Sequence, residues 1–264
     1  MDKKFLENCL EKGMSTRDIE KICDKNHRTI SYWINKYGLN DKSKYRKYDN
    51  YKFEKIDTPE KAYILGFLLA DAAIRNEQVE ISVCMRDKVI VEYIASILNC
   101  NVIYDNTFNK KSRRFPRARI IKKITDILKF TSGEKKIGRH YPRIRNDLER
   151  FMILGLFDSD GCLTWGRRKD KNRIWQKICF TSQLKILEGV QKYLKNKLKI
   201  STVIRPKSDE KCYVLEFSDR DDVIKFCNHI YPNENFIILE RKYLKYKALR
   251  LELEENGGST EKAC

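Results

Sequence analysis

Two apolar stretches of the chain follow the same pattern. Residues 64–71 and 153–160 each have a glycine in third place, bulky apolar residues around it and an aspartate in eighth place. The pattern predicts two buried helices with a glycine inside each. Such a glycine costs roughly 1 kcal/mol relative to alanine, so it is expected where another backbone comes very close. We therefore expect the two helices to pack on each other through Gly66 and Gly155, with their aspartates side by side.

The two aspartates, Asp71 and Asp160, indicate a chemistry for these helix ends. Neighbouring carboxylates repel each other, and a divalent cation holds them together at least cost. Hard oxygen ligands favour Mg²⁺ or a similar ion. A core helix that is merely capped by Asp-Gly would explain one copy well, but two copies in one chain favour the cation site.

Each apolar helix is followed by the same series of patterns, in which alternation predicts strands and helical spacing predicts helices. In the first half these are a strand at 78–84, a helix at 87–98, strands near 102–104 and 115–121, and a helix at 125–130. In the second half they are a strand at 174–181, a helix at 185–198, strands at 203–204 and 213–218, and a helix at 221–230.

The two halves therefore predict an internal duplication. Residues 92–98 align with residues 188–194, an offset of 96 positions (188 minus 92), whereas the two motif aspartates are 89 positions apart. The second copy therefore has about 7 extra residues after its motif, which we place in the basic hairpin 167–173. The predicted fold class is α+β, with tandem αββαββα repeats that form a pseudo-two-fold saddle. Two ordinary α+β domains with a solvated basic face are the alternative.

The polar faces of the strands would line the concave side of this saddle. β-Ribbons of this width fit the major groove of DNA. The residues expected to contact DNA there are Gln78, Glu80, Ser82, Arg117 and Arg119 in the first half and Arg173, Trp175, Lys177 and Thr181 in the second.

Residues 1–40 have a separate helical pattern. Helical spacing, a stop at Gly13, a cap at Ser15 and a third helix over 27–37 are similar to a helix-turn-helix of phage and transposase proteins. The start of such a third helix reaches base edges. An ordinary three-helix scaffold is the alternative. The residues expected to contact DNA are Arg28, Thr29, Ser31, Tyr32 and Lys36.

Composition supports a polyanionic partner. The 264 residues include 55 basic and 37 acidic side chains, for a net charge of +18. A generally lysine-rich proteome is the alternative explanation. No apolar run of 18 residues and no signal peptide are present, and the nine cysteines form no CxxC pair. We expect a cytoplasmic protein of a bacterium or phage-infected cell with reduced thiols that mostly fill the core. Isolated histidines and the lack of a glycine-rich phosphate loop argue against histidine-based nuclease chemistry and nucleotide hydrolysis.

The double motif resembles the LAGLIDADG motif of homing endonucleases, from about residue 59 to residue 247. The resemblance implies a monomeric, site-specific endonuclease that makes a Mg²⁺-dependent double-strand break in a long DNA site. It also implies a set of site residues. The acids Asp71 and Asp160 and the carbonyl groups of Ala70 and Ser159 would bind the metal, and the catalytic basic residues would be Lys136 (or Lys135) and Lys242 (or Arg241).

One position departs from the family pattern, because Ala72 stands where the family has glycine. If that position needs a positive φ, alanine is strained there. This leaves open an RNA maturase for a group I intron, with intron RNA as partner, or a DNA-binding protein whose catalysis has decayed. The predicted organisation is a helix-turn-helix at 1–40, a basic linker at 41–58, motif halves at 59–148 and 149–250, and a flexible tail at 251–264.

Overall fold

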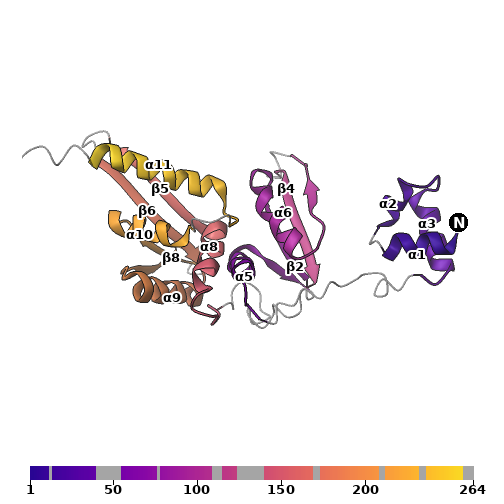
Figure 1. The fold of residues 1–264 in the computed structure, drawn as a ribbon, viewed down its shortest axis with the longest axis horizontal. Helices are drawn as coiled ribbons and strands as arrows, with labels where there is room; N and C mark the ends of the chain where they lie inside the picture. The colour runs from indigo at the N-terminus through magenta and orange to yellow at the C-terminus, as the bar shows by residue number, and fades with distance from the viewer. Residues whose placement is uncertain are drawn as a thin grey trace, which may run out of the picture. The chain divides into compact units, whose positions relative to one another are not determined.

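The computed structural model describes residues 1–11, 14–39, 55–75, 78–108, 115–123, 140–168, 173–207, 212–231 and 236–257. The chain divides into two units, Met1–Tyr51 and Lys52–Cys264, which are described separately (Figure 1). In the described residues no helix has both the length and the apolar character needed to cross a membrane.

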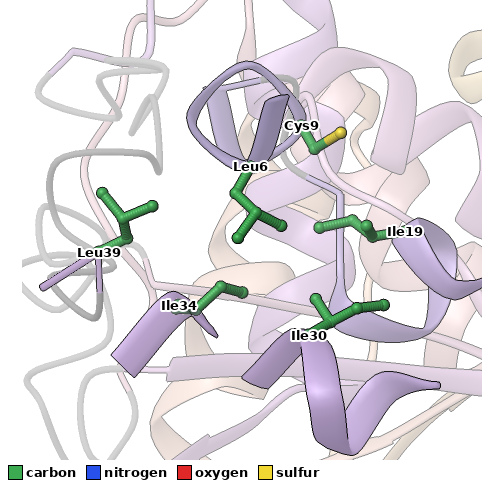
Figure 2. Close-up of a cluster of buried hydrophobic side chains, with 6 residues drawn as sticks. All are labelled: Leu6, Cys9, Ile19, Ile30, Ile34 and Leu39. Carbon is green, nitrogen blue, oxygen red and sulfur yellow. The ribbon is translucent and has the colours of Figure 1, made fainter. Parts of the chain in front are cut away.

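The first unit contains helices α1 (Lys3–Glu11), α2 (Thr16–Glu20) and α3 (His27–Lys36). Their apolar side chains meet in one small core (Figure 2), which confirms three helices in this segment. The core consists of Leu6, Cys9, Ile19, Ile30, Ile34 and Leu39.

Local capping explains where these helices start. The hydroxyl of Ser15 accepts a hydrogen bond from the amide of Asp18, whose carboxylate accepts one from the amide of Ser15. Asn26 caps α3 by accepting from the amide of Thr29, and Gly38 follows α3 with a φ of +67°. The predicted starts of the second and third helices, after Ser15 and at His27, are confirmed. Gly13 lies outside the described residues.

The second unit is built around helices α5 (Pro59–Asp71) and α8 (Glu149–Asp160), which pack against each other (Figure 1). A Cβ atom added to Gly66 would overlap the carbonyl oxygen of Met152, and one added to Gly155 would overlap that of Tyr63. The predicted packing through both glycines is confirmed. The middle of each helix is buried on all sides, as expected for apolar helices enclosed by other elements.

Two antiparallel sheets follow the two helices and share one topology, which confirms the internal repeat. The first sheet has the order β1-β2-β4-β3, with β1 (Ala73–Arg75), β2 (Gln78–Cys84), β3 (Ile103–Asp105) and β4 (Arg117–Lys123). The second has the order β5-β6-β8-β7, with β5 (Gly161–Arg168), β6 (Arg173–Ser182), β7 (Val203–Pro206) and β8 (Tyr213–Phe217).

Helices pack on the sheets and enclose the core. The 3₁₀ turn η1 (Met85–Asp87) and helix α6 (Lys88–Ile97) lie against β2 and β4. Helices α9 (Leu184–Tyr193), α10 (Arg220–Ile230) and α11 (Glu240–Gly257), with the π turn η4 (Leu194–Leu198), lie against the second sheet. Phe226 of α10 contacts the rings of Phe157, Phe180 and Phe217, so the end of α8, the second sheet and α10 share one aromatic core.

Several elements differ from the sequence prediction. Strand β5 begins directly after Asp160 and β1 begins two residues after Asp71, where no strand was located by pattern. Strands β5 and β6 are longer than their counterparts because they carry the extra residues of the second copy. Residues 251–257 belong to α11, so the predicted tail is wrong over that stretch.

The predicted helix at 125–130 and the linker at 41–54 lie outside the described residues. Of the described cysteines only Cys9 and Cys227 are buried, so the prediction that most cysteines fill the core is wrong.

Replacing Gly155 by alanine should destabilise the second unit, because the added methyl group meets backbone of α5 that cannot move aside. We expect a loss of about 1–3 kcal/mol or more in the free energy of unfolding, measured by chemical denaturation. The matched control is Gly166→Ala, whose methyl group would meet only the side chain of Trp175, at 3.1 Å. Equal costs for the two variants would contradict the glycine-mediated contact.

Candidate active site at the paired helix ends

The C-terminal ends of α5 and α8 border one cavity. Its volume is about 280 Å³, and its walls come from both halves of the second unit. Asp71 from α5 and Ser159 from α8 both line it, so the first motif acid and the residue that precedes the second border the same cavity. Asp71, Ser159 and Asp160 are all partly exposed. The polar residues around them in the wall include Ser82, Asp87, Arg117, Asp158 and Arg241.

The residue after each acid leaves its helix in an extended conformation. Ala72 has φ −74° and ψ 137°, and Gly161 has φ −76° and ψ 158°. Neither residue needs a positive φ, so alanine is unstrained at position 72. Gly161 has a different reason to lack a side chain, because an added Cβ would overlap the ring of Phe157. The departure of Ala72 from the family pattern therefore does not disturb the backbone around Asp71.

A second carboxylate, Asp158, is buried within α8 itself. Its side-chain oxygen Oδ2 accepts hydrogen bonds from the hydroxyl of Tyr63 on α5 at 3.0 Å and from the amide of Leu239 at 2.9 Å. Burial raises the pKa of Asp158 to about 6, although the nearby ammonium of Lys242 opposes that rise. The first copy has Leu69 at this position. Asp158 therefore joins α8 and the segment at Leu239 in the second copy to α5 in the first, at a position where the first copy has an apolar residue.

Lys242 is buried beside Asp158 at the start of α11. Its ammonium group donates to the carbonyl oxygens of Phe157, Asp158 and Gly161 at 2.5, 2.8 and 2.5 Å. Burial lowers the pKa of Lys242 to about 8, while the negative charge of Asp158 acts against that shift. Lys242 is not a solvated surface lysine, because its side chain is enclosed. Its predicted action on a DNA phosphate stays a prediction.

Arg241 joins the two halves on the other side of the cavity. Its guanidinium forms a two-pronged ion pair with Asp87 of η1, at 2.9 and 3.0 Å. The hydrogen bond to Asp87 raises the pKa of Arg241. Asp87 comes from the first half and Arg241 from the second, so this pair ties the halves together at the edge of the cavity.

The first sheet has one face opposite to its buried residues Val79, Ile81, Ala118 and Ile120, which we call its open face. The strand register places four of the predicted DNA contacts on this face. Glu80 and Ser82 alternate with the buried residues of β2, and Ser82 pairs with Arg119 of β4 while Glu80 pairs with Ile121. Arg117 pairs with Cys84, which lies on the same side of β2 as Ser82. Gln78 has the same register position opposite Lys123. Arg119 forms an ion pair with Glu80 at 3.4 Å.

The open face of the second sheet lies opposite to the buried residues Leu163, Ile178, Phe180, Leu215 and Phe217. Arg173, Trp175, Lys177 and Thr181 alternate with the inward residues of β6, so all four predicted contacts share this face. Trp175 is 43% exposed and lies over Gly166 of β5, which leaves room for its ring. Lys177 of β6 forms an ion pair with Glu216 of β8 at 3.2 Å. The pair between Glu80 of β2 and Arg119 of β4 links the corresponding strands of the first sheet, with the charges exchanged.

In the first unit, the predicted contacts on α3 are placed on its solvent side. Arg28, Ser31, Tyr32 and Lys36 are exposed, with Tyr32 exposed by 56%, whereas Ile30 and Ile34 face the core. Thr29 is partly buried and its hydroxyl hydrogen-bonds to the cap residue Asn26 at 3.1 Å. Four of the five side chains are therefore accessible from solvent, and Thr29 takes part in the cap.

Comparisons with known proteins agree with the geometry of the second unit. Residues 147–231 match the family model described as a LAGLIDADG-like domain. The fold is that of the LAGLIDADG meganucleases. No curated protein matches the chain.

Solved structures support the LAGLIDADG fold over most of the chain. The I-GzeII homing endonuclease in complex with its DNA target aligns with a TM-score of 0.52 at 11% identity, over 78% of this chain and 93% of the other. The meganuclease I-AabMI bound to uncleaved DNA gives 0.52 at 12% identity, over 76% and 92%. I-SmaMI bound to uncleaved DNA in the presence of calcium ions gives 0.52 at 10% identity, over 77% and 94%. Identities this low establish the fold alone.

Some site residues of this LAGLIDADG fold were predicted and others were missed. The predicted Lys135 and Lys136 lie outside the described residues. Asp158 and Asp87 were not predicted, although the acid of Asp158 within an otherwise apolar helix is a signal that could have identified it, since a buried charge needs partners. Asp87 has no such signal, because its partner Arg241 is 154 residues away.

The donors at the helix ends fit a hard divalent cation. The side-chain oxygens Asp158 Oδ1 and Ser159 Oγ are buried and have no hydrogen-bond partner among the described residues, and both residues line the cavity with Asp71. Carboxylate, hydroxyl and carbonyl oxygens are the ligands that Mg²⁺ takes. Nowhere in the described ranges do three His, Cys, Asp or Glu side chains converge, so carbonyl groups, water or a bound phosphate would have to supply the remaining ligands.

The ion pair between Asp87 and Arg241 should stabilise the second unit. The carboxylate of Asp87 is only 13% exposed and both prongs of the guanidinium are used, so a double-mutant cycle with Asp87→Ala and Arg241→Ala should give a coupling of about 1 kcal/mol. The same cycle on Arg145 and Asp147, which are both well exposed, should give no measurable coupling. A coupling at Asp87 as small as this control would contradict the structural tie.

Proposed function

We propose that this chain is a single-chain, site-specific DNA endonuclease of the LAGLIDADG homing type, which makes a double-strand break in a long target. The observation that carries the proposal is the shared cavity at the ends of α5 and α8, which is lined by Asp71 and by Ser159, the neighbour of Asp160. Paired acids at the centre of a DNA-binding surface are what hydrolysis of two opposed phosphodiester bonds requires.

In this proposal Asp71 and Asp160 hold Mg²⁺ together with the carbonyl groups of Ala70 and Ser159. Bound there, the metal ions would make a water nucleophilic and neutralise charge on the phosphate. The chain itself supplies the rigidity of the site, because both acids end helices whose contact leaves no space for a side chain. The calcium-containing structure of I-SmaMI on DNA supports a divalent ion in this fold.

The open faces of the two sheets supply the proposed DNA-binding surface. They carry the exposed side chains of Arg117, Arg173 and Trp175, and the chain as a whole has a net charge of +18. Cationic side chains would bind phosphates, and the alternating positions along β2 and β6 would read bases in the major groove. Related folds in solved structures are bound to DNA, which supports the same partner here.

We also propose that the first unit is a helix-turn-helix module that adds contacts to the DNA. Three capped helices with a shared core and an exposed, polar α3 support this assignment. The side chains at the start of α3 would reach base edges, with Lys36 near a phosphate.

The competing function is binding without cleavage, as an RNA maturase or as a DNA-binding protein with decayed catalysis. The reason to consider it was possible strain at Ala72, and the extended backbone at that residue removes this reason. The substrate to test is DNA in which the two sequences that flank the gene are joined directly, without the gene between them. Cleavage of a site selected from this DNA would support the nuclease. Binding of that DNA without cleavage, together with stimulated splicing of an intron RNA, would support the maturase.

Replacing either motif acid by its amide should stop cleavage and leave DNA binding largely intact. The loss of a metal ligand removes several kcal/mol of stabilisation, so the cleavage rates of Asp71→Asn and Asp160→Asn should fall at least about 100-fold. The measurement is a gel assay with each strand labelled separately, alongside affinity in Ca²⁺. Full activity in either variant would show that its acid has been assigned wrongly.

Replacing Ala72 by glycine should leave the cleavage rate unchanged within about twofold, since position 72 has an unstrained negative φ. A rate increase of tenfold or more in the same assay would mean that alanine impairs the first acid. Such a result would restore the case for a partly decayed site.

Removal of residues 1–40 should weaken DNA binding without stopping cleavage. Each phosphate contact that is lost should reduce the slope of log affinity against log salt by about 0.9. The slope is obtained from binding titrations at several salt concentrations, with the variant Lys3→Ala in the full chain as a control away from α3. An unchanged slope would contradict a DNA-binding role for the first unit.

A further inference from the structure

Lys242 uses all of its hydrogen-bonding capacity within the protein. An ammonium group has three donors, and the described contacts include three carbonyl acceptors, those of Phe157, Asp158 and Gly161, at 2.5–2.8 Å. The side chain is only 6% exposed. Because its three N–H donors are engaged and the ammonium group is enclosed, Lys242 has no donor left for a hydrogen bond to a DNA phosphate on the open face.

The three carbonyl groups lie on both sides of Asp160. Two precede this residue in the last turn of α8, and the third belongs to Gly161, where β5 begins. Carbonyl groups at the end of a helix lack partners within the helix, and a cation there is favourable. A single side chain that binds the backbone before and after Asp160 fixes the direction in which its carboxylate leaves the helix.

Lys242 is in turn held by the segment around it. The amide of Lys242 donates to the carbonyl of Leu239 at 2.9 Å, and the amide of Leu239 donates to the side chain of Asp158 at 2.9 Å. The same carboxylate oxygen accepts the hydroxyl of Tyr63 from α5. The start of α11, the end of α8 and the helix α5 therefore form one connected, buried group.

We infer that Lys242 is a positioning residue for Asp160, which holds the end of α8 in its active geometry by capping three carbonyl groups and does not contact the phosphate of DNA. The catalytic consequence rests on the proposed endonuclease function. The backbone consequence does not, because it concerns the protein without DNA or metal.

The first test uses the full chain without DNA or metal. In Lys242→Met, which keeps the length of the side chain and removes its donors, the amide of Gly161 should exchange its hydrogen at least about tenfold faster than in the wild type. That amide donates to Phe157 at the helix end. The matched control, Lys245→Met, changes an exposed lysine one turn along α11 and should exchange like the wild type. Unchanged exchange in Lys242→Met would overturn the inference.

The second test separates positioning from phosphate contact. In Ca²⁺, the slope of log DNA affinity against log salt should be the same for Lys242→Met and the wild type, whereas loss of a phosphate contact would reduce it by about 0.9. In Mg²⁺, Lys242→Met should slow cleavage and should raise the Mg²⁺ concentration needed for half of the maximal rate. An unchanged Mg²⁺ requirement, or a reduced slope, would overturn the inference.

If Lys242→Met does not fold, the variant Lys242→Arg replaces it in the exchange and salt-slope measurements. The planar guanidinium keeps the charge and cannot meet three converging carbonyl groups in the same way, so exchange at Gly161 should again be faster while the salt slope stays unchanged. A wild type that cleaves no selected DNA would refute the proposed function, and the exchange and slope measurements would still decide the role of Lys242.

Discussion

The contact between α5 and α8 is the constraint on which the rest of the second unit depends. Gly66 and Gly155 each face a backbone carbonyl of the other helix with no space for a methyl group. Because both glycines stand five residues before a motif aspartate, the close approach brings both helix ends to one place. The two sheets then begin at these helix ends, the first with β1 at Ala73 and the second with β5 at Gly161.

The two copies of the repeat are alike in backbone and different in electrostatics. At the position of the buried Asp158, the first copy has Leu69. Burial brings the pKa of Asp158 up to about 6 and that of Lys242 down to about 8, so near pH 7 both groups remain charged and attract each other. Buried opposite charges fix a geometry more than they add stability. This is consistent with a role for the pair in placing the residues around Asp160.

Most of the fold could be predicted from the sequence because its periodicity is local. Strand β2 was predicted with both of its bounds, and the parity of its residues gave the open face, since a strand alternates its sides residue by residue. The start of α2 followed from its cap at Ser15. Strands β1 and β5 were missed because each follows its helix without a turn signal. Helix α11 was not predicted, although its buried residues Tyr246, Leu249 and Leu253 have helical spacing.

The candidate site was predictable only in part. Asp71 and Asp160 were predicted as site residues because the motif occurs twice, and this stays a prediction. The enclosure of Lys242 and the pairing of Asp87 with Arg241 depend on contacts over more than 80 residues of sequence. Such contacts leave no local pattern in a lysine-rich chain. The conformation of Ala72 was equally hidden, because a missing glycine can reflect either a positive φ or a close neighbour.

The central claim is that the two helix ends together form one cation site on a DNA-binding surface. The most direct measurement is a crystal structure of the chain on its selected DNA with Mn²⁺, located by anomalous scattering. We predict that Mn²⁺ lies at the ends of α5 and α8, in contact with the carboxylates of Asp71 and Asp160 and with a DNA phosphate. A metal bound elsewhere, or carboxylates of Asp71 and Asp160 that face away from the DNA, would contradict the account.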